Sequence, residues 1–260
     1  MAQIPYIFNQ IVSFIPKDVF DRLVVKHKAN NYVKDYTCWS HLLVMMWAQL
    51  TGRRSLRDIE SSLRAHSDKT YRMGIGRCIS RNNIANANAR RDVSVYRELA
   101  QVMMGRTGYL SEKDETLSAI GRIFNLNGFF AVDSSSVSLE LTRHRWSVSQ
   151  KGVGGIKMHT MYDLLRNAPR MCLITGHEER DQTFMEDYPY ESGCFYMFDK
   201  MYFKTRGLER VRSNGAFFVI RIKSNVIYEV VDDMPVVGVH VLADRLIRFT
   251  SFYLCRVVSR

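Results

Sequence analysis

Several features that define particular classes of protein are scarce or missing in this sequence. The chain has five cysteines, at positions 38, 78, 172, 194 and 255, and no Cys-x-x-Cys pair. Cysteines this far apart argue against structural zinc and a disulfide framework, so we interpret them as isolated thiols in a reducing compartment. The longest apolar segment, residues 42–50, is far too short to span a bilayer. No basic region followed by an apolar core opens the chain, so no secretion signal is recognisable. We expect a cytoplasmic protein with no membrane contact.

The residues that are present make an ordinary globular composition with an excess of positive charge. Hydrophobic residues contribute 46% and charged residues 24%, and 260 residues are enough for one large domain or two smaller ones. The net charge of +11 is uneven, because residues 1–128 carry 19 Lys/Arg against 11 Asp/Glu and residues 129–260 carry 18 against 15. A basic front half favours a polyanionic partner, although many basic proteins bind none.

The first half of the chain has the pattern of a helical domain. The apolar segment 39–50 has helix length and ends at a Thr-Gly pair, a plausible helix stop. Ser55 and Asp58 resemble a capping box, in which the hydroxyl and the acid satisfy backbone N–H groups at a helix start. A second helix start is predicted at Ser80, and a third helix over residues 92–104.

Arginines surround these predicted helices. Short helices joined by Gly-containing turns, with arginines on their outer faces, are typical of helix-turn-helix-like DNA-binding domains. A plain helical bundle with solvated arginines fits the same pattern. The candidate DNA-binding residues of this half are Arg53, Arg54, Arg57, Arg81, Arg90 and Arg91.

The second half of the chain is rich in predicted strands. Residues 105–127 are polar and are predicted to contain a linker, which sets a domain boundary near residue 125. Short apolar or alternating segments with many aromatic and branched residues then follow one another, with few convincing helices. The predicted strands are 128–132, 137–141, 156–164, 171–174, 195–198 and 217–222.

Two aspartates stand directly after predicted strands. Asp133 follows the apolar run 129–132, and Asp199 follows the run 195–198. An acid at the end of a buried strand is partly desolvated and needs a partner, such as a metal ion, a basic side chain or backbone amides. Two such acids on adjacent strands can hold Mg²⁺, which keeps several waters and needs few carboxylates. An Asx turn or a helix cap also explains either aspartate taken alone.

Three blocks of the second half carry a resemblance to a known family: residues 133–136, 154–163 and 190–199. They are similar to the core blocks of bacterial DDE transposases of the insertion-sequence-four type. The front of the chain resembles the domain of unknown function that precedes the core in one branch of that family, and the match continues to about Tyr253.

The resemblance implies a fold and a division of the chain. A helical N-terminal DNA-binding domain over residues 1–124 is expected to precede an RNase H-like mixed-sheet core, of the α+β or α/β class, over residues 125–225. Residues 226–260 are then the start of a β-rich insertion. In the family one catalytic aspartate ends the first core strand and another ends the fourth, which correspond here to Asp133 and Asp199.

The resemblance also implies a chemistry and partners. Asp133 and Asp199 would bind two Mg²⁺ or Mn²⁺ ions and serve phosphoryl transfer that cuts and joins transposon ends. Lys157 and His159 lie in a matching block, where they either contact DNA near the scissile phosphate or have structural roles, and Lys200 is a further candidate DNA contact. The implied partner is double-stranded DNA, both terminal inverted repeats and target, bound by a homodimer in the bacterial cytoplasm at the nucleoid.

The sequence departs from the family pattern at three places. Lys200 and Met201 follow the second aspartate where the family has Arg-Gly, and Glu179-Arg180-Asp181 replaces a His-Asp pair. The Tyr-x-x-Arg-x-x-x-Glu signature that carries the third acid is absent from the 260 residues. We therefore expect a truncated chain that is inactive alone and leaves one apolar face of its sheet bare.

Two further hypotheses compete with a transposase. In one, the chain is a non-catalytic DNA-binding protein that recognises transposon ends and inhibits an intact transposase. In the other, it is a metal-dependent nuclease of the same fold that hydrolyses DNA without joining it.

Overall fold

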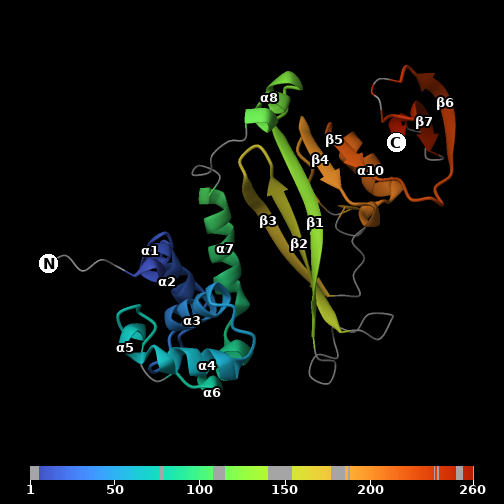
Figure 1. Ribbon diagram of the computed structural model, residues 1–260. Helices are drawn as coiled ribbons and strands as arrows, with labels where there is room; N and C mark the ends of the chain where they lie inside the picture. The colour runs from blue at the N-terminus through green and yellow to red at the C-terminus, as the bar shows by residue number, and fades with distance from the viewer. Residues whose placement is uncertain are drawn as a thin grey trace. The chain divides into compact units, whose positions relative to one another are not determined.

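The computed structural model describes residues 6–76, 79–107, 115–139, 154–176, 185–186, 188–236, 238, 240–249 and 254–259. The chain forms two compact units, Met1–Gly105 and Arg106–Arg260, which we call the helical unit and the sheet unit. Figure 1 shows helices alone in the first unit and a mixture of strands and helices in the second. The predicted order of a helical region followed by a mixed-sheet core is confirmed.

The helical unit begins most of its long helices at hydroxyl side chains. Thr37, Ser55 and Ser80 each accept a hydrogen bond from the backbone N–H three residues on, so the starts predicted at Ser55 and Ser80 are confirmed. Gly52 follows α3 with a left-handed φ of 66°, which confirms the predicted stop. The helices are α1 (Ile7–Ser13), α2 (Lys17–Lys26), α3 (Cys38–Leu50), α4 (Leu56–Ala65), α5 (Ser67–Thr70), α6 (Arg81–Arg90) and α7 (Val93–Thr107).

The apolar side chains of these helices form two buried clusters. One gathers Leu43, Trp47 and Ile84 from α3 and α6 with the apolar residues of α4. The other joins Phe20 of α2 to Val95 of α7. Burial of these faces stabilises the unit, because the hydrophobic effect scales with the apolar area removed from water. Among the helices in the described ranges, none combines the length and apolar character needed to cross a membrane.

The sheet unit is built on a five-stranded sheet with the order β3-β2-β1-β4-β5. β1, β2 and β3 are antiparallel neighbours, whereas β4 runs parallel to β1 and β5 parallel to β4. This mixed sheet agrees with the expected RNase H-like class. The strands are β1 (Gly128–Ser138), β2 (Gly155–Asp163), β3 (Ala168–Gly176), β4 (Cys194–Phe198) and β5 (Phe217–Ile220).

The separate strand predicted at 137–141 is wrong. β1 is continuous through the serines and reaches Ser138, because its antiparallel pairing with β2 extends to the Ser138↔Gly155 pair. This polar part of the strand is stable because its backbone N–H and C=O groups form hydrogen bonds with β2. Its own side chains are not needed to hold it.

The two faces of the sheet differ in what covers them. On one face, α10 (Thr205–Ser213) contributes Leu208 and Val211 to a buried cluster with Val132 and Phe198. The opposite face holds the alternate residues of the strands, and in the described part of the chain it leaves large apolar side chains exposed. They are Val137, Met158, Ile174, Met197, Phe217 and Val219.

Two further parts complete the sheet unit. The helix α8 (Glu115–Ile123) lies within the stretch predicted to contain a linker, and no helix was expected there. A three-stranded antiparallel sheet of β6 (Tyr228–Met234), β7 (Ala243–Phe249) and β8 (Leu254–Ser259) follows β5. Phe249 of β7 packs edge-on against Phe203, with ring centroids 5.9 Å apart, so the small sheet joins the main core.

Candidate active site

The two aspartates lie where β1 and β4 stop pairing. The parallel register runs from Gly128↔Cys194 to Val132↔Phe198, and the next residue of each strand is Asp133 or Asp199. Residues paired across neighbouring strands share a face, and faces alternate along each strand. The backbone remains extended at Asp199, with φ −73° and ψ 158°. The register therefore brings the two acids side by side on the exposed face, Asp133 exposed and Asp199 half-buried.

The position of Asp133 within its strand differs from the prediction. Asp133 was expected to end a strand, but β1 continues for five residues beyond it to Ser138. The pairing of Asp133 with Thr160 of β2 holds this continuation, while β4 has already ended at Phe198. Asp133 thus lies in an extended edge of the sheet, and its side chain is presented from a regular strand.

The register that aligns the acids is set at the start of the two strands. The backbone N–H of Asn127 donates to the carbonyl of Gly193 at 3.0 Å, and its side-chain amide donates to the carbonyl of Ser192 at 3.0 Å. Gly193 has a φ of +73°, and a Cβ there would lie 2.6 Å from the Asn127 amide nitrogen. A glycine is needed because it alone accepts both this backbone conformation and this close approach without strain.

The buried side chain of His159 supports the turn after β4 through a hydrogen bond to Tyr202. The carboxylate of Asp199 accepts from the backbone N–H of Met201 at 3.4 Å and caps the short helix η2 (Lys200–Tyr202). The Tyr202 hydroxyl bonds Nδ1 of His159 at 3.0 Å, and Nε2 of His159 bonds the Thr175 hydroxyl at 3.0 Å. These bonds link β2 and β3 to the turn that contains Asp199.

His159 is only 1% exposed, and a ring buried this deeply does not reach a nucleic acid. Of the two roles left open by the sequence, the structure favours the structural one. Lys157 is half-buried, and its register with Ser136 sets it on the face opposite to Asp133. Lys200 is exposed directly beside Asp199 and remains available to a polyanion.

Comparison with known proteins finds matches for both parts of the chain. Residues 126–251 match the family model described as the transposase DDE domain, and residues 5–76 match a domain of unknown function, DUF4372. The chain belongs to the DDE transposase family. It is also similar to the protein named "Putative transposase y4zB" of Sinorhizobium fredii, with 30% identity over 173 residues that cover 65% of this chain and 46% of that protein. The chain thus spans about half the length of this curated relative.

The donor set of the transposase chain suits a hard divalent cation. Carboxylate oxygens are the ligands that Mg²⁺ and Mn²⁺ prefer, and an exposed position beside Asp133 leaves room for the waters that Mg²⁺ retains. Within the described ranges, no group of three or more His, Cys, Asp or Glu side chains could hold a metal. The carboxylates that follow the paired parts of the central strands β1 and β4 are those of Asp133 and Asp199.

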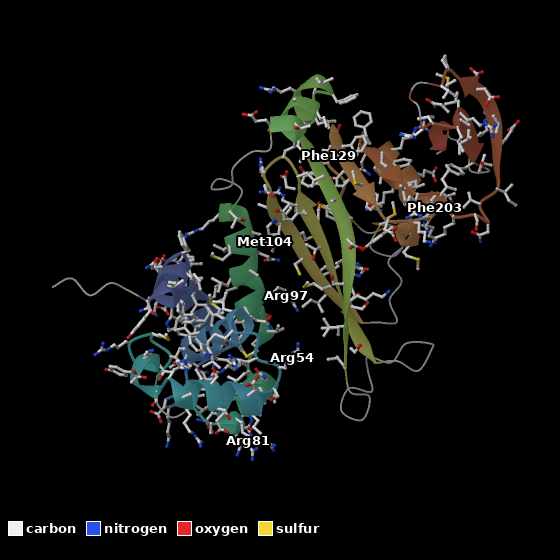
Figure 2. The ribbon with its side chains drawn as sticks, viewed as in Figure 1. Arg54, Arg81, Arg97, Met104, Phe129 and Phe203 are labelled. Carbon is white, nitrogen blue, oxygen red and sulfur yellow. The ribbon has the colours of Figure 1, made fainter. Side chains whose placement is uncertain are left out.

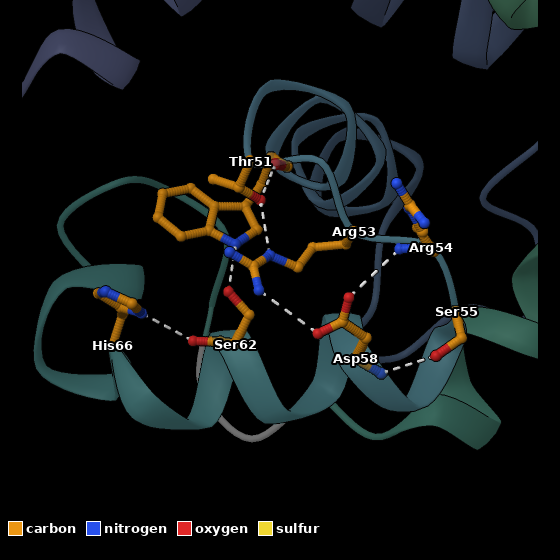
Figure 3. Close-up of polar contacts among 8 residues, drawn as sticks. Thr51, Arg53, Arg54, Ser55, Asp58, Ser62 and His66 are labelled. Carbon is orange, nitrogen blue, oxygen red and sulfur yellow. Dashed lines mark hydrogen bonds and ion pairs between the residues drawn. The ribbon is translucent and has the colours of Figure 1, made fainter.

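Two arginines just before α4, Arg53 and Arg54, form hydrogen bonds with the Asp58 carboxylate at the start of this helix. The Arg53 guanidinium donates to the Asp58 carboxylate at 3.4 Å, and the other oxygen of Asp58 accepts from the backbone N–H of Arg54 at 3.2 Å (Figure 3). The Ser55 hydroxyl accepts from the Asp58 N–H at 3.1 Å, as the predicted capping box requires. The acid reaches back to Arg54 rather than to Ser55. In Figure 3 the Arg54 side chain points away from Asp58.

The remaining candidate arginines separate into two kinds. Arg57, Arg81 and Arg90 are exposed, and Figure 2 shows Arg81 at the outer side of α6. Arg91 is half-buried instead. Its guanidinium donates to the carbonyls of Thr37, at 2.6 Å, and Tyr36, and it lies 5.0 Å from the centre of the Tyr36 ring. The prediction of a DNA contact at Arg91 is therefore corrected, since this guanidinium anchors the end of α6 to the segment before α3.

Proposed function

We propose that this chain serves DNA transposition, with Asp133 and Asp199 as ligands for divalent cations beside the scissile phosphodiester. The observation that carries the proposal is the parallel register in which each aspartate directly follows the Val132↔Phe198 pair. Acids at the end of this pairing share one solvent-accessible face of the sheet, where a DNA backbone can approach. Family membership supports the same reading.

The proposed cofactors are two Mg²⁺ or Mn²⁺ ions. Such ions stabilise the attacking and leaving oxygens of an in-line displacement at phosphorus. The chain's own contribution is to present two negative oxygen ligands from fixed positions. Asp133 is held by regular strand pairing, and Asp199 by the hydrogen-bonded chain through Tyr202 and His159. This arrangement makes a Ser, Cys or His nucleophile unnecessary.

DNA binding is proposed to involve the helical unit. Residues 1–105 carry 16 Lys/Arg against 8 Asp/Glu, and five of those acids already pair with basic side chains of the same unit. The exposed Arg54, Arg57, Arg81 and Arg90 are the proposed phosphate contacts, and Lys200 is proposed to contact DNA at the aspartates. Binding to terminal inverted repeats and target DNA as a homodimer is part of the same proposal.

A second candidate function is a non-catalytic DNA-binding protein that competes with an intact transposase. The excess of basic side chains in the helical unit supports this alternative as well, because phosphate contacts bind DNA without any chemistry at the aspartates.

The assay that separates these functions uses the full chain, Mg²⁺ and linear DNA that carries the flanks of its reading frame. Strand-transfer products support the transposase, and their loss in Asp133→Asn and Asp199→Asn assigns the chemistry to this site. Nicks without joined products indicate a hydrolytic nuclease. Salt-sensitive binding without any cleavage favours the competitor of an intact transposase.

A further inference from the structure

The helix α6 has an outer face of unusual composition. Residues 81–91 contain four asparagines, three alanines and three arginines, and no acid. Asparagine has a low helix propensity, so four of them within one ten-residue helix are not explained by helix formation. Every residue of α6 except Ile84 and Ala87 is exposed.

The inner face of α6 is firmly attached to the rest of the helical unit. Ile84 is fully buried in the cluster that contains Trp47. The side-chain oxygen of Asn88 accepts from Nε2 of His41 at 2.7 Å, which links α6 to α3. At the other end, the backbone N–H of Arg81 donates to the Glu60 carboxylate of α4 at 3.2 Å. Asn88 therefore has a structural role, and the orientation of the helix is defined.

The outer face carries a regular row of side chains. Asn82, Asn86 and Arg90 are spaced by four residues and so lie one above another on the helix surface. Ala85 and Ala89 form the adjacent row, again four apart. Within the described part of the chain, no hydrogen bond holds the side-chain amides of Asn82 and Asn86, and no ion pair holds Arg90. The side chains of Asn82, Asn86 and Arg90 are therefore exposed and available to contact another molecule.

We propose that α6 is the helix through which this chain reads DNA sequence, with Asn82 and Asn86 as the specificity-determining residues. This inference rests on the proposed function in DNA transposition and adds the element that recognises bases. The side-chain amide of asparagine pairs with N6 and N7 of adenine, the arginine guanidinium with O6 and N7 of guanine, and an alanine methyl contacts the methyl group of thymine.

The dimensions and charge of α6 fit the major groove of duplex DNA. A ten-residue helix is about 15 Å long, and the major groove is about 12 Å wide and admits one helix. Small alanines beside the asparagine row allow the helix backbone to approach the base edges closely. Arg81 at one end and Arg57 on the neighbouring α4 are exposed and supply positive charge for the flanking phosphates. A recognition site rich in adenine and thymine follows from this set of residues.

The test is selection from a duplex pool. The full chain is incubated at about 150 mM salt with 24-base-pair duplexes randomised at ten central positions, and bound duplexes are sequenced. The variants are Asn82→Ala and Asn86→Ala, with Asn86→Gln as the conservative change and Asn31→Ala as the matched control. Asn31 is an exposed asparagine of the same unit that lies outside α6. Alanine raises helix propensity, so the variants do not lose specificity through unfolding of α6.

The wild-type chain is expected to enrich a site that contains adenine. Each alanine variant loses the preference at one position, and the ratio of affinities for the selected and scrambled duplexes falls about 5- to 150-fold. Asn31→Ala keeps the enrichment, and Asn86→Gln retains part of it. In every variant the affinity for scrambled duplex stays within about twofold of the wild-type value, because phosphate contacts supply the sequence-independent part of the affinity.

Three results overturn parts of the account. Unchanged enrichment in both alanine variants removes α6 as the reading element and leaves the proposed transposition function intact. If the wild-type chain binds duplexes but enriches no sequence, α6 is again removed as the reading element and the proposed transposition function is left intact. A wild-type chain that binds no duplex at all overturns the inference together with the proposed function.

Discussion

Replacement of Ile84 by alanine tests how α6 is held. The side chain is 0% exposed and lies in the cluster with Leu43 and Trp47. The change removes three carbon atoms, which at ~0.8 kcal/mol for each buried methyl or methylene is about 2.4 kcal/mol of lost transfer free energy. The cavity left behind adds to this, so we expect Ile84→Ala to lower the free energy of unfolding by about 3–4 kcal/mol. That is a large share of the ~5–15 kcal/mol typical of a domain.

Urea unfolding of the full chain, followed by tryptophan fluorescence, measures this loss. Trp39 and Trp47 lie in the helical unit and report on its unfolding. With a denaturant slope of ~1–3 kcal/mol per molar, the midpoint is expected to fall by about 1–4 M. The matched control is Ile7→Ala, where the isoleucine is 76% exposed and the change is expected within about 0.5 kcal/mol. Equal midpoints for Ile84→Ala and the wild-type chain refute the docking of α6 through this side chain.

Three further changes are expected to act on separate supports of the fold. Ser55→Ala removes the N-cap bond to Asp58 and is expected to cost about 0.5–2 kcal/mol by urea unfolding, whereas Ser55→Asp retains most of it. Burial lowers the pKa of His41 below its ordinary value, so the stability that the neutral ring contributes is present above pH ~6.5 and is lost as pH falls through the lowered pKa. Thermal midpoints between pH 7.5 and 5.5 should therefore fall in the wild-type chain and less in His41→Gln. Gly193→Ala forces a side chain into a left-handed backbone beside Asn127 and is expected to cost more than ~1 kcal/mol, and an unchanged melting temperature contradicts this.

Much of the fold could be predicted from local sequence. The helix starts at Ser55 and Ser80 are local hydrogen-bonding patterns, and the structure has the same bonds. The short apolar strands around residues 128–132, 195–198 and 217–222 are visible in the sequence because runs of aromatic and branched residues favour strands. These strands lead directly to the two aspartates, which is why the candidate acids could be named before the structure.

The features that sequence reasoning missed depend on distant partners. β1 continues beyond Asp133 through serines only because β2 supplies its backbone hydrogen bonds. α8 was not predicted because its polar surroundings read as a linker, whereas Gly121 of this helix packs against Leu165. The burial of His159 and the internal role of Arg91 likewise depend on Tyr202 and on the carbonyls before α3. The asparagine row of α6 was visible as four asparagines without an acid in residues 81–91, but no local rule marks it as functional.

The central claim is that Asp133 and Asp199 jointly hold a divalent cation. Titration of the full chain with Mn²⁺, followed by the electron paramagnetic resonance signal of the free ion, measures this directly. Asp133→Asn and Asp199→Asn are each expected to weaken binding at least about tenfold, because each removes one anionic oxygen ligand. Asp232→Asn, at an exposed aspartate on β6, is the matched control and should bind like the wild-type chain. Mn²⁺ affinities for both site variants equal to that of the wild-type chain would contradict the account.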